Sequence, residues 1–373
     1  MKIVINALSA RLGGGQTYLK NLLAHLPAQP NLEIVVYAPD SLVLPENSQL
    51  RRGTTMWATT NPLLRTLWEH FVLPRILLEE KAHILFCPGG VVATRAPLGC
   101  KVVTMFRNMI PFDSAALARI PHGLQKLRNF MLKRVMLRSM ANADLTIFIS
   151  DHARQVIETL TSVRKSVTIP HGINAAFRTH GQNVQRPNWL PKSEYLLYVS
   201  RFDVYKHQFE VATAYAALPS DLRSRYKLLL VGEADNALAQ DVADLARKNC
   251  LESQIIIVGP IAYAELPAVC HHAAVNLFAS SCENCPNILL EALGAGRPVL
   301  SSAVMPMPEF GGDAVGYFVP TDPTSIRDEL TRVLCDESIR NELAAGAVRR
   351  SADFDWVKTS RTTWQSIADL VTE

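Results

Sequence analysis

The sequence lacks the features that mark membrane-spanning and secreted proteins. None of its apolar runs reaches the roughly 20 residues that a helix needs to cross a bilayer. The opening MKIVINAL is too short and turns polar too soon to act as a secretory signal. Aromatic residues make up only 7% and charged residues 19%, whereas 48% of the chain is apolar, as in globular proteins. We therefore expect a globular protein, and we expect any contact with a membrane to be peripheral.

A disulfide framework is also missing, because the seven cysteines are odd in number and irregularly spaced. Free thiols are typical of a reducing compartment, so we predict a cytoplasmic location, with peripheral attachment to the inner face of the plasma membrane as an extension. Cys282 and Cys285 have the spacing of a redox or zinc pair, and His271 and His272 lie nearby. No second cysteine pair completes a zinc site, and adjacent histidines point to different faces of a helix. We therefore expect no metal site.

A strong excess of one charge is absent as well. The 38 lysines and arginines stand against 34 acidic residues, which gives a net charge of +4. This mild excess does not indicate a nucleic-acid-binding protein. It fits anionic small molecules, or an anionic membrane surface where the basic residues cluster.

What the sequence does contain is two series of short apolar runs with helix-length segments between them. Its 373 residues suffice for two domains. The runs are continuous rather than alternating, as in parallel strands that are covered on both faces. The alternation of strand and helix predicts doubly wound α/β sheets. The first series lies at residues 3–7, 34–38, 84–87, 102–105 and 145–149, and the second at 195–200, 227–231, 255–258, 275–279 and 298–301.

A polar, aperiodic stretch with two prolines, residues 175–193, separates the two series and is interpreted as a linker. We therefore predict two Rossmann-like domains, residues 1–175 and 194–355, followed by a tail helix at 356–373. Sheets of this kind bind ligands at the carboxyl ends of their strands. A cleft between two such domains is the expected active site.

The strongest chemical signal follows the fourth strand of the second series. Glu283 lies on the loop after this strand, and Glu291 lies eight residues later, one turn inside a helix. We expect that helix to begin around Pro286, Asn287 and Ile288. The free amides and the dipole of a helix start favour a bound phosphate. Glu291, placed among apolar residues, is suited to accept hydrogen bonds from paired hydroxyls such as those of a ribose.

Residues 283–291 resemble the E-x7-E motif of the retaining glycosyltransferases of family 4, which have the GT-B fold. The following GAGRPV at 294–299 and MPEF at 307–310 are similar to the continuation of that family's motif. The strand that ends before Arg201 and is followed by Lys206 is also similar to a family pattern. The resemblance covers nearly the whole chain and implies the GT-B fold, with the tail helix crossing back onto the first domain.

The resemblance implies a role for each of these residues. Arg201 and Lys206 hold the donor's diphosphate, where a planar fork and a point charge meet the negative charge that builds on the leaving group. Glu283 contacts the sugar ring, and Glu291 holds the ribose. No metal or other cofactor is then needed. The anomeric configuration is retained through front-face attack, and the leaving phosphate takes the acceptor's proton.

The first domain opens with a glycine loop at 13–15 between a strand and a helix. As a dinucleotide-binding fingerprint this loop is poor, because Tyr18 replaces the third small residue. By resemblance, Gly14 and Gly15 approach the donor phosphate and the acceptor. Arg107 and Asn108 stand where the family often has His-Asp. Since an arginine cannot act as a general base, we assign this pair only to the acceptor side or to the sugar.

A basic segment at residues 119–138 lies between Asp113 and Asp144, and no acidic residue occurs between those two. Apolar and basic residues mix along it, which is typical of a helix that lies on an anionic membrane. A helix that packs on the core with a solvated basic face fits equally well. Its basic residues are Arg119, Lys126, Arg128, Lys133, Arg134 and Arg138.

The resemblance therefore implies a hexosyltransferase of bacterial surface polysaccharide or lipopolysaccharide synthesis. Its expected partners are a nucleotide sugar, with GDP-mannose as the leading candidate, and a glycan or polyprenyl-linked acceptor; no nucleic acid is expected. Two alternatives stay open: a GT-B-fold isomerase of nucleotide sugars, and a non-catalytic subunit that binds a nucleotide sugar. The isomerase would need an acid/base pair, and the sequence shows none clearly.

Overall fold

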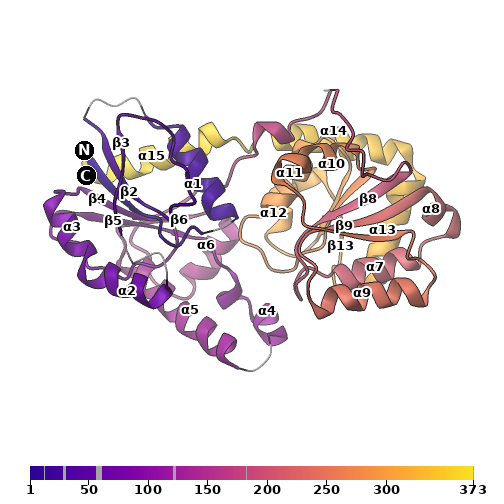
Figure 1. Ribbon diagram of the computed structural model, residues 1–373, viewed down its shortest axis with the longest axis horizontal. Coiled ribbons are helices and arrows are strands. Elements are labelled where there is room, and N and C mark those ends of the chain that lie inside the picture. Colours follow the sequence, from indigo (N-terminus) through magenta and orange to yellow (C-terminus); the bar gives the residue numbers. More distant parts are fainter. Residues whose placement is uncertain (12, 28–30, 56–60, 121–122, 182, 373) are drawn as a thin grey trace. The chain divides into compact units, whose positions relative to one another are not determined.

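The computed structural model describes residues 1–372 except 12, 28–30, 56–60, 121–122 and 182. The chain divides into two compact units (Figure 1). Unit 1 comprises Met1–Gly172 together with Trp356–Glu373, and unit 2 comprises Ile173–Asp355. Each unit is built on its own parallel sheet with helices on both faces, which is the doubly wound α/β architecture that the sequence predicts.

Unit 1 contains a seven-stranded sheet in the order β3-β2-β1-β4-β5-β6-β7. All neighbouring strands are parallel, so their carboxyl ends share one edge of the sheet. The strands are β1 (Lys2–Asn6), β2 (Glu33–Tyr37), β3 (Leu50–Arg52), β4 (Ile84–Cys87), β5 (Lys101–Phe106), β6 (Leu145–Phe148) and β7 (Ser166–Thr168).

The helices of unit 1 cover both faces of this sheet. Figure 1 shows α2, α3 and α5 on one face and α1 with α15 on the other. The helices are α1 (Gly14–Ala24), α2 (Pro62–Phe71), α3 (Leu73–Glu79), α4 (Ser114–Arg119), α5 (Leu124–Asn142), α6 (Asp151–Glu158) and α15 (Trp356–Thr372), with the 3-10 turn η1 (Ile110–Phe112).

The last helix, α15, belongs to unit 1 although the whole of unit 2 precedes it in the chain. The indole Nε1 of Trp364 donates to the carbonyl of Leu22 at 3.2 Å, and Thr359 Oγ1 donates to the carbonyl of Pro170 at 2.8 Å. The first bond holds α15 against α1, and the second ties it to the segment that follows β7. The predicted tail ends at residue 373, which lies outside the described residues.

Unit 2 contains a six-stranded parallel sheet in the order β10-β9-β8-β11-β12-β13. Its strands are β8 (Glu194–Val199), β9 (Tyr226–Val231), β10 (Ile255–Gly259), β11 (Val275–Phe278), β12 (Val299–Ser302) and β13 (Gly316–Phe318). The helices are α7 (Gln208–Ala216), α8 (Ser220–Arg225), α9 (Ala237–Lys248), α10 (Leu266–His272), α11 (Asn287–Gly294), α12 (Met307–Gly311), α13 (Pro323–Cys335) and α14 (Glu337–Ser351), with 3-10 turns η2 (Ala175–Phe177), η3 (Tyr263–Glu265) and η4 (Gly312–Ala314).

Residues 175–193 are not the linker that their polar composition indicates. Phe177 and Leu190 are buried in the hydrophobic core of unit 2. His271 Nδ1 lies 3.0 Å from Thr179 Oγ1, which ties the same stretch to α10. The unit boundary therefore falls between residues 172 and 173. Two large apolar side chains anchor the stretch even though it lacks the periodicity of a helix or strand.

The cysteines, the metal-ligating side chains and the lengths of the helices can be stated for the described residues. All seven cysteines lie in it, and all are free thiols. Among the described residues, no group of three or more histidine, cysteine, aspartate and glutamate side chains is arranged to hold a metal ion. No described helix combines the length and the apolarity needed to cross a membrane.

Candidate active site

The predicted catalytic residues of unit 2 come together where β8 and β11 end. These strands are neighbours in the sheet, so the loops that follow them lie side by side. Several hydrogen bonds join the loops. The amide of Ser281 donates to the carbonyl of Tyr205 at 2.8 Å, and His207 Nε2 lies 2.8 Å from Ser281 Oγ. The loop that carries Lys206 is thereby fixed to the loop that carries Glu283.

Lys206 and Glu283 form an ion pair between these loops, from Nζ to Oε1. Their side chains are only 12% and 17% exposed. The ammonium group also lies over the ring of Phe278, at 5.4 Å from its centre, and the phenol of Tyr198 donates to the backbone carbonyl of Lys206. The lysine is therefore held in place by both its backbone and its side chain. Such a partly desolvated positive charge interacts more strongly with an anion than a fully hydrated one does.

Arg201 lies directly beyond β8 and is more exposed, with 57% of its side chain accessible. Its Nη2 donates to Asp203 Oδ2 at 3.0 Å and to the Tyr205 hydroxyl at 3.4 Å. Tyr205 also lies beside Lys206, whose Nζ is 5.2 Å from its ring centre. The two predicted phosphate-binding cations thus share one tyrosine.

A glycine keeps the backbone at this edge compact. Gly232 follows β9 at φ +147°, and a Cβ built on it would lie 2.3 Å from the carbonyl oxygen of Ser200. Any side chain at position 232 would push away the residue next to Arg201. The end of β8 is therefore set by close contact between neighbouring loops.

The start of α11 limits which of the predicted residues can donate a backbone amide to an anion. Pro286 caps the helix and has no N–H to donate. The amide of Asn287 donates to the carbonyl of Cys285 at 3.0 Å. Amides in a first helical turn have no carbonyl partner within their own helix. Among these three predicted residues, Ile288 is the one whose amide this turn leaves without a carbonyl partner.

Glu291 is buried inside α11 with 8% of its surface exposed. The Tyr263 hydroxyl donates to its Oε1 at 2.6 Å. Burial raises the pKa of the Glu291 carboxyl to about 7, and the hydrogen bond from Tyr263 acts in the opposite direction. An acid placed in this way is not a solvated surface residue.

His207 is one residue of this edge that the sequence did not single out. It has a left-handed backbone at φ 55°, which is uncommon for a residue other than glycine. Its imidazole is fully buried and contacts two side chains. Nδ1 lies 3.1 Å from Glu210 Oε1, and Nε2 contacts Ser281 Oγ. Ser281 is 74 positions away in the chain, and nothing in the sequence marks the pair.

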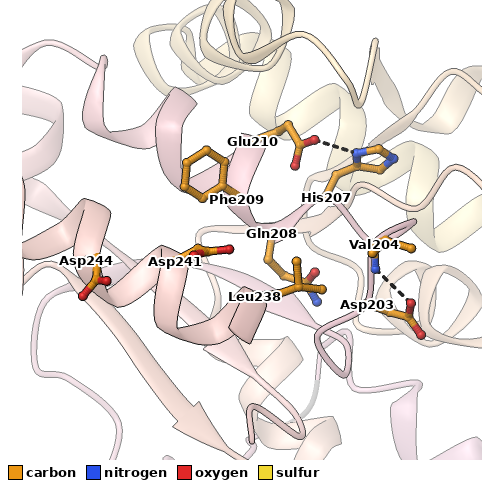
Figure 2. A pocket seen from close by; sticks show the side chains of 9 residues that line it. All are labelled: Asp203, Val204, His207, Gln208, Phe209, Glu210, Leu238, Asp241 and Asp244. Atoms are coloured by element: carbon orange, nitrogen blue, oxygen red, sulfur yellow. Dashed lines mark hydrogen bonds and ion pairs between the residues drawn. The ribbon is translucent and has the colours of Figure 1, made fainter. Parts of the chain in front are cut away.

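A cavity of about 380 Å³ lies beside the same loop. Figure 2 shows the side chains that line it. It lies against α7 and α9, and Phe209 and Leu238 contribute apolar surface. Carboxylates dominate its polar groups, so it is poorly suited to a diphosphate. The four acidic residues are Asp203, Glu210, Asp241 and Asp244.

In unit 1, Gly14, Gly15 and Arg107 line a cavity of about 270 Å³ together with Ser9 and other residues that follow β1 and β4. A Cβ on Gly15 would lie 3.9 Å from Arg107 Nη1. The Arg107 guanidinium carbon is 5.4 Å from the ring centre of Tyr18, which gives a cation–π contact.

Asn108 and His171 have local contacts instead. Asn108 Oδ1 accepts from the amide of Ile110 at 3.2 Å and so supports the turn that follows. His171 is buried and stacks on Tyr18 with ring centres 5.5 Å apart; it also packs against Trp356 at 5.3 Å. These aromatic contacts give His171 a packing role in unit 1.

Comparison with known proteins decides the family. The family model described as Glycosyltransferase Family 4 matches residues 12–177. The model described as Glycosyl transferases group 1 matches residues 181–350. The chain is a family 4 glycosyltransferase.

Two curated relatives of this glycosyltransferase come from Escherichia coli. The serotype-specific mannosyltransferase WbdA is 25% identical over 257 residues, which are 67% of this chain and 31% of WbdA. The O-antigen chain mannosyltransferase B is 26% identical over 259 residues, which are 67% of each protein. The aligned part of the chain thus spans about a third of the length of WbdA.

Solved structures show the fold of the glycosyltransferase. Anabaena HepE, crystallised in complex with UDP-glucose, superposes with a TM-score of 0.74 at 14% identity. The match covers 99% of this chain and 100% of HepE. The two parallel sheets with their helices are therefore the GT-B fold.

Proposed function

We propose that this glycosyltransferase moves a hexose from a nucleoside diphosphate sugar to a glycan or polyprenyl-linked acceptor, with retention of the anomeric configuration. The observation that carries the proposal is the meeting of Arg201, Lys206 and Glu283 at the ends of β8 and β11. The names of the two E. coli relatives support mannose as the sugar and O-antigen or lipopolysaccharide synthesis as the setting. GDP-mannose is the leading donor.

The charges at this edge suit the departure of a nucleoside diphosphate. Arg201 and Lys206 stabilise the negative charge that builds on the leaving phosphate, with the amide of Ile288 as a further donor. The carboxylate of Glu283 is held beside Lys206 and stabilises the positive sugar ring of the transition state. The leaving phosphate takes the acceptor's proton. In this proposal the two cations serve where other enzymes use a metal ion.

The cavity of unit 1 is assigned to the acceptor side. Gly14 and Gly15 let a ligand approach the backbone. Arg107, held by Tyr18, supplies a cation that binds hydroxyl or phosphate oxygens. Asn108 follows Arg107 in the chain and is assigned to the same side, and its Oδ1 accepts from the amide of Ile110.

Product stereochemistry tests this function. Proton NMR would follow GDP-mannose, UDP-glucose and ADP-glucose incubated separately with enzyme and methyl α-mannoside. We expect GDP-mannose to be consumed and its mannose to be joined to methyl α-mannoside through a new α-glycosidic bond. A β-linked product would overturn retention. A nucleotide sugar that binds but is never consumed, with or without methyl α-mannoside, would favour the non-catalytic subunit.

We further propose that α5 binds unit 1 to the anionic lipids of the cytoplasmic leaflet. The structure divides the apolar residues of this helix between two sides. Met136 and Met140 are buried, whereas an i, i+3, i+7, i+11 stripe is exposed. The stripe consists of Leu124, Leu127, Met131 and Val135, and the exposed Arg128, Arg134 and Arg138 lie on the same side. Apolar side chains flanked by arginines suit a lipid surface.

The neighbouring helix α2 extends this surface. Leu63 and Phe71 of α2 are 74% and 61% exposed. His70 of α2 lines one cavity of about 600 Å³ together with Val135 and Arg138 of α5, so the two helices lie side by side there. The predicted segment 119–138 includes residues 121–122, which lie outside the described residues.

A flotation assay tests the membrane proposal. Wild-type enzyme is expected to float with vesicles that contain 30% phosphatidylglycerol and not with pure phosphatidylcholine. The Leu127→Glu/Met131→Glu variant is expected to lose most of this binding. Met305→Glu/Val319→Glu, which alters exposed apolar residues of unit 2, is the matched control and should still float. If the wild-type enzyme does not bind anionic vesicles at 0.1 M salt, the membrane proposal is wrong.

A further inference from the structure

Tyr263 is the hydrogen-bond partner of the buried acid of α11. It belongs to η3, which follows the edge strand β10, and 45% of its surface is exposed. Its hydroxyl donates to Glu291 Oε1 at 2.6 Å. One side chain thus links solvent at the carboxyl edge of the sheet to a carboxylate that is only 8% exposed.

The ring of Tyr263 also packs against Phe177. The two ring centres are 5.5 Å apart at an angle of 57°. Phe177 is fully buried, and its carbonyl oxygen would lie 3.1 Å from a Cβ placed on Gly294 at the end of α11. The stretch around Phe177 is therefore packed tightly against the helix that carries Glu291. This packing restricts where the Tyr263 hydroxyl can point.

We propose that Tyr263 is a positioning residue for Glu291, whose carboxylate it orients toward the ribose hydroxyls of the donor. The inference rests on the proposed donor site. An ionised carboxylate has two oxygens with about four acceptor sites, so the bond from Tyr263 to Oε1 leaves Oε2 to accept from the ribose. A hydrogen bond to a charged acceptor is directional and stronger than a neutral one. Loss of the phenol would therefore free the carboxylate to turn and weaken its selection of a hydroxyl.

The same hydrogen bond affects when Glu291 is ionised. Burial raises the pKa of this carboxyl to about 7, and the bond from Tyr263 opposes that rise. Among the described residues, Tyr263 of η3 and Cys270 of α10 are the titratable groups that interact with it. Burial raises the pKa of the Cys270 thiol far above neutrality, so this thiol stays uncharged. Removal of the Tyr263 hydroxyl should therefore move the ionisation of Glu291 to higher pH.

The test compares ribonucleotides with their 2′-deoxy counterparts by titration calorimetry. GDP, UDP and ADP are each titrated beside 2′-deoxy-GDP, 2′-deoxy-UDP and 2′-deoxy-ADP between pH 6 and pH 9. The wild type should prefer the ribose form of its nucleotide by about 10- to 100-fold at pH 8, as expected for a hydrogen bond to a charged group. At pH values below 7, where Glu291 becomes protonated, the preference for the ribose form should decrease.

Tyr263→Phe is expected to reduce the ribose preference about three- to tenfold at pH 7 and to shift its pH midpoint upward, with kcat at saturating donor nearly unchanged. The ratio of the affinities of two ligands, measured on one protein sample, does not depend on how much of the variant is folded. Tyr317→Phe removes a different phenol of unit 2, which donates to the Gly312 carbonyl at 2.9 Å, and should leave both ratio and midpoint unchanged.

Each outcome bears on a different claim. If the wild type binds its nucleotide with a ribose preference and Tyr263→Phe keeps the same preference and midpoint, the role of Tyr263 is refuted while the donor site stands. If the wild type binds none of the three nucleoside diphosphates, the donor site itself fails. Glu291→Gln should abolish the pH dependence; if the dependence survives, another group is responsible for it.

Discussion

Replacement of Lys206 by alanine is expected to lower kcat/KM for sugar transfer by about 100- to 1,000-fold. The lysine is 12% exposed and is held by Tyr198, Phe278 and Glu283, so its charge sits in a fixed and partly desolvated position. A preorganised charge of this kind stabilises a developing anion without reorganisation during the reaction. The variant also leaves Glu283 without its cation. Steady-state kinetics with the preferred donor would measure the loss.

Two companion variants separate this effect from general damage. Lys206→Arg keeps the charge and should recover part of the activity. Arg225→Ala removes an exposed ion pair with Glu194, which lies at the opposite end of β8, and should leave kcat/KM unchanged. Activity within threefold of wild type in Lys206→Ala would show that the ion pair is only structural.

Glu291→Gln is expected to weaken nucleotide binding about 100-fold and, at alkaline pH, to stabilise the fold. The folded-state pKa of Glu291 is raised from an ordinary 4.5 to about 7, so the native state holds this proton more tightly than the unfolded chain does. The carboxyl's favourable contribution is complete below pH 4.5 and is lost as the pH rises through 7. Glutamine does not titrate and avoids that loss.

The stability difference between Glu291→Gln and wild type should therefore grow by about 2 kcal/mol between pH 5 and pH 8. Urea unfolding at the two pH values, followed with a signal from unit 2, measures this difference. Any fixed cost of burying the amide cancels in the comparison. An equal difference at both pH values would mean that Glu291 ionises like an exposed acid.

The core of the fold follows from the sequence because it is made of continuous apolar runs. The ten predicted strands agree with β1, β2, β4, β5, β6 and β8–β12 to within one residue at each end. The strands that the sequence missed are β3, β7 and β13, which lie at edges of their sheets and have only three residues each. β10, the other edge of the unit 2 sheet, has five residues and was predicted. The three missed strands are therefore too short to form a recognisable apolar run.

The candidate site was predictable where a motif carries it. Arg201, Lys206, Glu283 and Glu291 stand at fixed spacings, and the structure brings the first three to one edge of the sheet. His207 and Tyr263 were not predictable, because their partners Ser281 and Glu291 are 74 and 28 positions away. The supposed linker at 175–193 failed for a similar reason, since Phe177 acts through tertiary packing and not through a local pattern.

Titration calorimetry tests most directly whether Arg201 and Lys206 hold the diphosphate of the donor. Wild-type enzyme, Arg201→Ala and Lys206→Ala would each be titrated with the preferred nucleoside diphosphate and with its monophosphate. We predict that the wild type prefers the diphosphate by about tenfold or more and that each variant loses most of this preference. A full preference for the diphosphate in both variants would contradict the proposed site.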